Sequence, residues 1–261
     1  MYLFNDITLL ITHYNRSYSL EKLLKSFVSI EVSFAEIIVS DDGSNENHIK
    51  YLHQLKVHHQ FNLLTTPLNK GLGNNINKGQ DAVKTKYTLY IQEDFVPELK
   101  LIKKLKIANQ FLEEDDDLDF VRFYAYTLFP NLIPYKEGFS LMTFNHFAFW
   151  ETYRKFYIYS DHPHLRRSTF LEKFGRYTEH TRSDRTEYNM MMQVLSVGVK
   201  AYFYKEYKSL LEQENSVTEP SSVKRNFWRE NQNILITIVR HIYRYLRFYL
   251  ELIIFKLRKK K

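Results

Sequence analysis

Hydrophobic and polar residues alternate in blocks along the first hundred positions. Three short apolar runs, at 7–11, 36–40 and 87–91, have the length and the β-branched content of buried strands. Between them, residues 18–29 and 73–84 carry apolar side chains at helical spacing. Strands and helices that alternate in this way predict parallel strands joined by right-handed crossovers, and therefore an α/β fold.

The same pattern extends along the chain, with one irregular stretch. It predicts helices at 46–57, 98–112 and 185–197, and strands at 61–65, 118–125 and 199–204. Residues 126–180 are rich in aromatic residues and prolines, and we expect loops and short elements there, over the edge of the sheet. The expected organisation is one domain at 1–215 with halves at 1–98 and 99–215, a linker at 216–226 and a helical tail at 227–261.

Polar clusters follow the three apolar runs, at the point where each run ends. They are Thr12–Arg16, Asp41–Ser44 and Gln92–Asp94. In an open α/β sheet, ligands bind outside the carboxyl ends of parallel strands, so the three clusters are expected to form one polar crevice. Its acidic content favours a metal ion or ribose hydroxyls as the ligand group, rather than bare phosphate.

Composition adds limits on chemistry and location. The chain has 261 residues, 44% of them hydrophobic and 16% aromatic, which is enough for a sizeable core. It has no cysteine, which excludes a disulfide framework, a cysteine zinc site and thiol chemistry. The first strand begins by about Ile7 and leaves no room for a cleaved signal peptide, so we expect a cytoplasmic location.

The net charge of +7 is concentrated at one end of the chain. From Lys224 onward there are eleven Lys or Arg residues and two Glu, a local balance of +9, which leaves −2 for residues 1–223. A nearly neutral body argues against a nucleic-acid partner. A basic tail is expected to contact an anionic surface.

The tail from 234 to 257 is largely apolar and has the pattern of a helix. Arg240, Arg244, Arg247 and Glu251 interrupt it at spacings of 4, 3 and 4, which places them on one helical face. Four charges disfavour a transmembrane helix and favour one lying in the interface of an anionic membrane, on its inner, cytoplasmic face. The competing interpretation is a helix that packs on the body or on a second copy, as in a homodimer.

Four motifs, in order, resemble the opening of the family 2 glycosyltransferases. They are 11–16, 37–44, 69–73 and 77–79, and the similarity covers about residues 5–98. The resemblance implies the GT-A fold, a Rossmann-like mixed sheet flanked by helices that binds a nucleotide-sugar, here followed by an amphipathic helical tail. It also implies that 1–98 is the donor nucleotide-binding half and 99–215 the acceptor-side half.

The resemblance implies roles for residues in the first two loops. Tyr14 would stack on a base, with Thr12 and Asn15 nearby, and Asp42 would accept a hydrogen bond from the uracil ring of a UDP donor. Asp41 is as well suited to brace the turn at Gly43.

Lys70 would lie near the diphosphate, at the N-terminus of the helix that follows it. A packing interpretation competes with this one, since the glycines of 71–79 let a helix begin close to the sheet.

Gln92-Glu93-Asp94 stands where the family has its Asp-x-Asp motif. By resemblance Asp94 would ligate Mg²⁺ or Mn²⁺, which bridges the donor diphosphate, and Glu93 would adjoin it. Hard divalent cations need only one or two protein carboxylates when substrate oxygens complete the shell. Gln92 replaces the usual first acid.

The second half offers a general base and an acceptor site. The family places a carboxylate at the start of a helix there, and Glu187 is the best match, with Asp184 as its rival. A helix-capping role competes with both assignments. His164, Arg166 and Arg167 are candidates for the acceptor side, against the simpler interpretation of surface arginines and a hydrogen-bonded histidine.

The resulting hypothesis is a metal-dependent hexosyltransferase. It would move a sugar from a UDP-sugar to a carbohydrate or lipid-linked glycan, with inversion, in the synthesis of a cell-surface polysaccharide. One alternative is a degenerate member that only binds a glycan or a partner. The other is a nucleotidyltransferase, which the absence of glycine from Thr12-His13-Tyr14-Asn15 argues against.

Overall fold

The computed structural model of the chain describes residues 2–146, 148, 151, 153–214 and 234–258. The strands are β1 (Tyr2–His13), β2 (Val32–Asp41), β3 (Asn62–Leu64), β4 (Tyr87–Gln92), β5 (Phe95–Pro97), β6 (Phe120–Arg122), β7 (Leu132–Pro134), β8 (Phe139–Met142), β9 (His164–Arg167), β10 (Ala201–Tyr204) and β11 (Leu211–Gln213). The helices are α1 (Ser17–Ser29), α2 (Glu46–His59), α3 (Leu72–Asp81), α4 (Lys100–Glu114), α5 (Phe170–Phe174), α6 (Ser183–Val197) and α8 (Ile234–Arg258), with short 3₁₀ turns η1 (Tyr153–Phe156) and η2 (Tyr207–Ser209).

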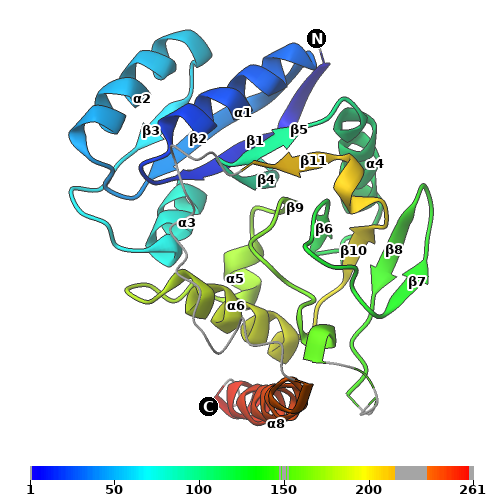
Figure 1. The fold of residues 1–261 in the computed structure, drawn as a ribbon. Helices are drawn as coiled ribbons and strands as arrows, with labels where there is room; N and C mark the ends of the chain where they lie inside the picture. The colour runs from blue at the N-terminus through cyan, green and yellow to red at the C-terminus, as the bar shows by residue number, and fades with distance from the viewer. Residues whose placement is uncertain (1, 147, 149–150, 152, 215–233, 259–261) are drawn as a thin grey trace.

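A mixed sheet runs through the molecule in the order β3-β2-β1-β4-β9-β6-β10-β8-β7 (Figure 1). The first four strands in this order are parallel, as the sequence predicts. β9 then enters antiparallel between β4 and β6. The carboxyl ends of β1, β2 and β4 therefore meet at one edge, which confirms the expected α/β fold and places the three polar clusters together.

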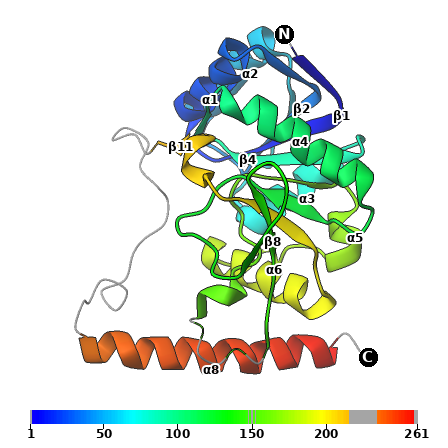
Figure 2. The same ribbon diagram turned by 90° about the vertical axis from the view of Figure 1, so that its right-hand side faces the viewer.

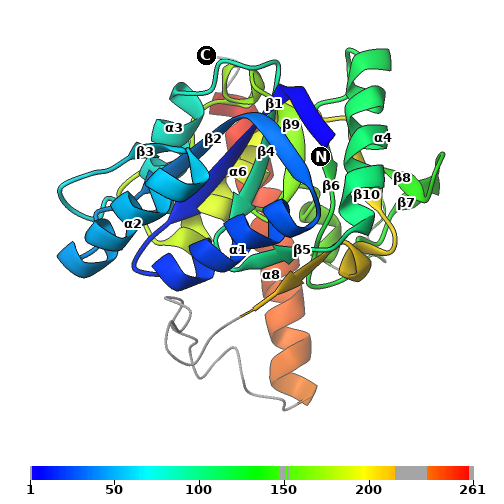
Figure 3. The same cartoon turned by 90° about the horizontal axis from the view of Figure 1, so that it is seen from above.

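Alternate side chains of the strands point to opposite faces, and helices cover both faces (Figure 3). Leu9 and Ile11 of β1 belong to a core shared with α1, α2 and α4. Leu10, between them, belongs to a second core shared with α3, α5, α6 and α8. The molecule is thus a three-layered α/β/α arrangement with one core on each side of the sheet.

The second half agrees with its prediction only in part. The predicted strand at 118–125 is shorter, since β6 spans only three residues. Residues 126–180, expected as loops and short elements, include the β7–β8 hairpin, β9 and α5. β9 has the sequence HLRR, which is too polar to resemble a buried strand. Its charge is accommodated because Arg166 donates to Tyr177 and Gln80 inside the fold.

A two-stranded sheet lies beside the main one. β11 pairs antiparallel with β5, so that Gln213 stands opposite Phe95. The backbone N–H of Glu214 extends this pairing by donating to the carbonyl of Asp94 at 2.8 Å. The last strand of the body is thereby attached to Asp94, the second residue after β4, in the third polar cluster.

The tail helix α8 runs as a straight rod along one side of the molecule, beyond α6 (Figure 2). Phe248 and Leu252 are buried against the body. The predicted linker at 216–226 and the predicted start of the tail at 227 lie outside the described residues. Among the helices that the structure describes, none has the length and hydrophobicity needed to cross a membrane.

Candidate functional site

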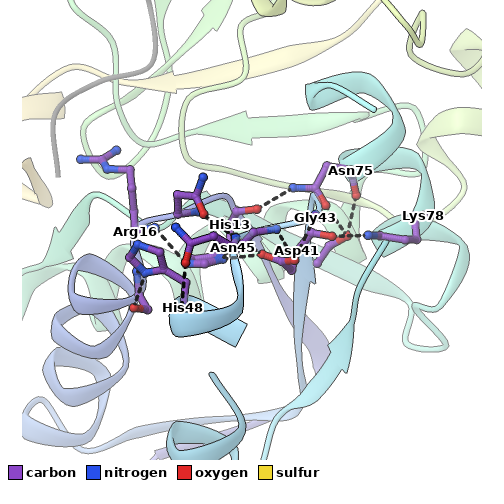
Figure 4. A network of polar contacts seen from close by, with 12 residues as sticks. His13, Arg16, Asp41, Gly43, Asn45, His48, Asn75 and Lys78 are labelled. Atoms are coloured by element: carbon purple, nitrogen blue, oxygen red, sulfur yellow. Dashed lines mark hydrogen bonds and ion pairs between the residues drawn. The ribbon is translucent and has the colours of Figure 1, made fainter. Parts of the chain in front are cut away.

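Asp41, the last residue of β2, holds the first two loops together (Figure 4). Its Oδ1 lies 2.8 Å from His13 Nδ1, and its Oδ2 accepts the backbone N–H groups of Gly43 and Ser44. Although burial acts to raise it, these bonds from His13 and Ser44 hold the pKa of Asp41 below its ordinary value. Asp41 is absent from the cavity wall, and its contacts match the turn-bracing interpretation.

The neighbouring Asp42 fixes a second loop. Its Oδ1 accepts the backbone N–H of Lys70 at 2.8 Å, and its Oδ2 accepts that of Gly71 at 2.9 Å. The side chain is only 3% exposed, and burial raises its pKa. Each carboxylate oxygen has a further lone pair, so Asp42 retains the capacity to accept from a ligand. It lines the cavity described below.

Helix α3 begins at the end of this loop. Gly71 precedes it with a φ of +89°, and a Cβ on Gly73 would lie 2.2 Å from the Thr178 carbonyl oxygen, so both positions need glycine. Asn75 then ties the helix to the strand ends, donating to the His13 carbonyl and accepting from Ser40. The Lys70 side chain is exposed and lies outside the cavity wall, which leaves backbone groups at this helix terminus.

An acidic pair at the end of β4 is bound by an internal cation. Arg16 Nη1 lies 2.9 Å from Glu93 Oε1 and 3.2 Å from Asp94 Oδ2. Gln213, on β11, donates to the same Asp94 oxygen at 3.0 Å. Burial and the neighbouring Asp94 raise the pKa of Glu93 to about 8, although Arg16 opposes the shift. Two carboxylates, one arginine and one amide therefore converge from three elements.

Several buried polar atoms of this cluster form no hydrogen bond within the described residues. Asp94 Oδ1, and Nε and Nη2 of Arg16, are buried and have no hydrogen-bond partner within the described part of the chain. Unpaired buried polar atoms are costly, and they are expected where a ligand completes the site. The cluster thus offers an acceptor and two donors to whatever occupies the cavity.

These loops enclose a cavity of about 660 Å³ at the carboxyl ends of the strands. A volume of this size suits a small-molecule ligand. Tyr126, 64% exposed, stands at its wall. The wall comprises Thr12, His13, Tyr14, Arg16, Asp42, Asn69, Gly71, Leu72, Asn75, Gln92, Glu93, Asp94, Tyr126, Thr181, Arg182, Ser183, Asp184 and Gln213.

The cavity brings together part of the predicted donor site. Thr12, Tyr14, Asp42, Glu93 and Asp94 all line it. Thr12 is nearly buried, and its hydroxyl lies 3.1 Å from that of Tyr90, while Tyr14 is 36% exposed.

Asn15 does not line the cavity. It has a φ of +51°, and it bonds to the second loop through Ser44 and Asn45. Its contacts are those of a residue that shapes the first loop.

The two candidate bases lie on α6, at different distances from the cavity. Asp184 is in the wall, where Arg182 contacts it at 3.2 Å. Glu187 is one turn further along the helix and faces a second polar cluster, in which its Oε1 accepts the backbone N–H of Asp161 at 3.3 Å. The cavity wall therefore ends close to Glu187 without including it.

The cluster around Glu187 contains a second carboxylate and a buried arginine. Burial and the neighbouring Glu187 raise the pKa of Asp161 to about 8. Burial also raises the pKa of Glu187, against the opposing effects of the Asp161 N–H and the charge of Arg122. Arg122 is held by the carbonyls of Tyr157 and Ile158. A pair of carboxyls with displaced pKa values is the arrangement of an acid–base site.

The three residues predicted for the acceptor side, His164, Arg166 and Arg167, lie in structural positions on β9. His164 and Arg166 are fully buried on β9, and Arg166 is bonded to Tyr177 and Gln80. Arg167 donates to the carbonyls of Leu112, Asp115 and Leu118 at the end of α4. None of the three lines the cavity, so they have no place in the site proposed below.

Three residues of the site were not assigned a role from the sequence. Arg16 lies in the first polar cluster, and a cation beside an acidic doublet is a signal that was available. Gln213 and Asp161 reach the site only through the pairing of β11 with β5 and the contact of residue 161 with α6. Neither contact leaves a periodic pattern in the sequence.

No group of three or more His, Asp or Glu side chains that would enclose a metal ion occurs among the described residues. A divalent cation bound to a nucleotide-sugar needs fewer protein ligands, because diphosphate and water oxygens complete its coordination shell. Asp94 Oδ1, buried and without a partner in the described chain, is a suitable oxygen ligand at the cavity. The residues present therefore fit a cation held by one carboxylate.

The fold, with a crevice at the strand ends, is of the GT-A type. The sequence profile of glycosyl transferase family 2 matches residues 8–175, and the chain belongs to this family. This confirms the resemblance seen in the four motifs.

Curated relatives match a smaller part. The poly-β-1,6-N-acetyl-D-glucosamine synthase of Staphylococcus epidermidis is 30% identical over 90 residues, which are 34% of this chain and 22% of that protein. The synthase of Staphylococcus aureus strain COL is 27% identical over a stretch of the same length. The chain thus matches about a fifth of the length of these relatives.

Solved structures share the fold at low identity. S. aureus TarS 1–349 in complex with UDP-GlcNAc superposes with a TM-score of 0.60 and 15% identity, over 94% of this chain and 73% of that one. The mannosyltransferase PcManGT of Pyrobaculum calidifontis, in complex with GDP-Man and Mn²⁺, gives 0.51 and 13%, over 75% and 53%. Identities this low support the architecture alone.

Proposed function

We propose that the chain is a glycosyltransferase that moves a sugar, with inversion, from a UDP-sugar to a carbohydrate or lipid-linked glycan. The setting proposed is the synthesis of a cell-surface polysaccharide. The family assignment and the cavity at the strand ends support the reaction class. The UDP-GlcNAc named in the TarS complex and the names of the curated relatives support the donor and the setting.

One observation carries the donor site. Asp94 Oδ1 is buried at the cavity without a partner in the described chain, and it lies beside Arg16, which has two unpartnered donors of its own. Arg16 would donate to the diphosphate, Tyr14 would stack on the base, and Asp42 would accept from the uracil ring. A Mg²⁺ or Mn²⁺ ion held by Asp94, when bound, would neutralise charge on the departing UDP.

The general base proposed is Glu187. The acceptor oxygen forms a bond to the anomeric carbon, its proton passes to the Glu187 carboxylate, and the bond from that carbon to the UDP oxygen breaks with its electron pair on UDP. The N–H of Asp161 and the charge of Arg122 favour the ionised form of Glu187. Asp161 would then keep the proton of the pair, since its pKa is raised to about 8.

Asp184 remains the rival base because it lines the cavity and Glu187 does not. Its contact with Arg182, at 3.2 Å, involves one of its two carboxylate oxygens.

Titration calorimetry of UDP into the protein, with and without Mn²⁺, tests the donor site. We expect binding that is strengthened by Mn²⁺ and lost in Asp94→Asn. The matched control is Asp81→Asn, which changes an exposed carboxylate on α3 paired with Arg176 and should bind as the wild type does.

Absence of UDP binding in the wild type under both conditions would overturn the proposed donor. Metal-dependent UDP binding without turnover of any UDP-sugar would instead favour the degenerate, binding-only alternative. Three residues favour this alternative, because the family usually has a charged residue in each place: Gln92 in the metal motif, Ile76 on α3 and Tyr188 beside Glu187.

A further inference from the structure

The polarity of α8 is reversed relative to a helix on a water-facing surface. Side chains are described for residues 237–257, and within that range every exposed one is a large apolar residue. They are Ile238, Val239, Ile242, Tyr243, Leu246, Leu250, Ile253, Ile254 and Leu257. Exposed fractions run from 43% to 67%. An amphipathic surface helix ordinarily directs such residues toward the core, and its charges outward.

Four charged residues of α8 contact the body instead, namely Arg244, Arg247, Glu251 and Lys256. Arg244 Nη1 donates to the Tyr153 hydroxyl at 2.9 Å. Glu251 lies 2.8 Å from Arg247 and 3.4 Å from Arg185 of α6. The charged face predicted from the sequence thus exists, but it forms contacts within the protein rather than an outer surface.

Aromatic packing fixes the rotation of the helix about its axis. Phe248 is 5% exposed, and its ring lies 5.0 Å from that of Tyr188 on α6. Tyr249 donates to the carbonyl of His146 on the same side. These contacts hold one face of the helix against α6 and η1. The exposed apolar residues between 238 and 257 therefore lie on the outward face of a helix that runs along the side of the molecule (Figure 2).

We propose that the outer face of α8 binds an anionic phospholipid bilayer, with the helix lying in the plane of the membrane interface. The apolar arc would enter the acyl boundary, as in amphipathic helices that lie at this depth. The proposal goes beyond the sugar transfer proposed above and does not require it.

The basic residues of the tail favour an anionic bilayer, rather than a second copy of the chain, as the partner of α8. The segment from Lys224 carries a balance of +9, of which Arg244, Arg247 and Glu251, with their contacts inside the protein, contribute only +1. The sequence after the helix is Lys259-Lys260-Lys261. Two copies joined through α8 would bring two such segments together, which is unfavourable. An anionic lipid surface attracts them, at roughly 1 kcal/mol for each basic residue close to it.

The position of the helix also suits the proposed acceptor. Arg182 to Asp184 at the start of α6 line the cavity, and Arg185 and Tyr188 of the same helix contact α8. A lipid-linked glycan held in the bilayer would therefore lie within reach of the site. This consequence, unlike membrane binding itself, rests on the proposed function.

Flotation of the full-length protein with vesicles tests the proposal. We expect it to float with vesicles of phosphatidylglycerol and phosphatidylcholine, more weakly with phosphatidylcholine alone, and less at high salt, which screens the charges. The double variant Leu246→Glu/Leu250→Glu should lower the partition coefficient by about tenfold or more. The control Val57→Glu alters a residue of α2 that is 75% exposed and should change nothing.

Two results would contradict the proposal. One is that the wild type stays in the lipid-free fraction when anionic vesicles are present. The other is that the double variant floats as well as the wild type does. Sedimentation velocity tests the alternative that a second copy of the chain binds the outer face of α8. If the wild type is a dimer that does not bind vesicles, and Leu246→Glu/Leu250→Glu dissociates this dimer, the face is assigned to a second copy. UDP titration of the same samples shows that the variant is folded, and separates failure of membrane binding from failure of the donor site.

Discussion

Arg16 Nη1 lies 2.9 Å from Glu93 Oε1 at the wall of the cavity, and both side chains are about one-tenth exposed. The same nitrogen reaches Asp94 at 3.2 Å. Removing one member of a buried ion pair leaves an uncompensated charge. Above about pH 8, where the Glu93 carboxyl is ionised, Arg16→Ala should therefore lower the free energy of unfolding by about 3–5 kcal/mol. Urea denaturation measures this. The control Lys25→Ala breaks the Lys25–Glu21 pair on the surface of α1 and should cost less than about 1 kcal/mol; equal losses would refute the argument.

The raised pKa of Glu93 predicts a pH dependence of stability. Its folded value is about 8 and its ordinary value is 4.5. Between these values the folded state holds a proton that the unfolded state has lost, so this group's contribution to stability falls as pH rises from about 4.5 to 8. Glu93→Gln should flatten the decline over this window, as measured by urea midpoints at several pH values. An unchanged slope would place the pKa of Glu93 elsewhere.

Gly43 should be irreplaceable for reasons of space as well as conformation. Its φ is +70°, and an added Cβ would lie 2.5 Å from the Leu68 carbonyl carbon. Gly198 has a φ of +91° with nothing within 4 Å, so Gly198→Ala has only the backbone strain, about 1–3 kcal/mol. Gly43→Ala should be less stable than Gly198→Ala in thermal unfolding, and it should also weaken UDP binding by shifting the loop that Asp42 holds. The reverse order of stability would contradict this account.

Substitutions on α6 distinguish the two candidate bases. Glu187→Gln should lower kcat by about 10²–10⁴-fold while UDP binding is retained, because proton transfer alone is lost. The charge of Asp184 acts to raise the pKa of Glu187. Asp184→Asn should therefore shift the acidic limb of the pH–rate profile to lower pH and keep the activity. Loss of turnover in Asp184→Asn, with Glu187→Gln active, would transfer the role to Asp184.

The first half of the fold could be predicted because its signals are local. Apolar runs such as 7–11 form central parallel strands with few exceptions, and the polar clusters after them meet because topology requires it. Thr12, Asp42 and Asp94 were placed at one crevice by this reasoning alone.

The second half could not be predicted in the same way, because its stability comes from contacts between distant segments. β9 is a central strand with two arginines, and Arg166 is tolerated inside because Tyr177 and Gln80 accept hydrogen bonds from its guanidinium. Charge in a short segment ordinarily indicates the surface, so the sequence favours an accessible acceptor side for His164 and Arg166 over the buried positions that they occupy. The tail shows the same difficulty: spacing identified its charged face, but not the direction in which that face points.

Helix α6 touches the cavity through its first turn and the tail helix through Arg185 and Tyr188. It therefore links the cavity to the face of α8 for which membrane binding is proposed. Thermodynamic linkage would make the two sites reciprocal: any factor by which a bilayer changed the affinity for nucleotide would be the factor by which nucleotide changed the affinity for the bilayer. Nucleotide in the cavity and lipid at α8 would then each report on the presence of the other.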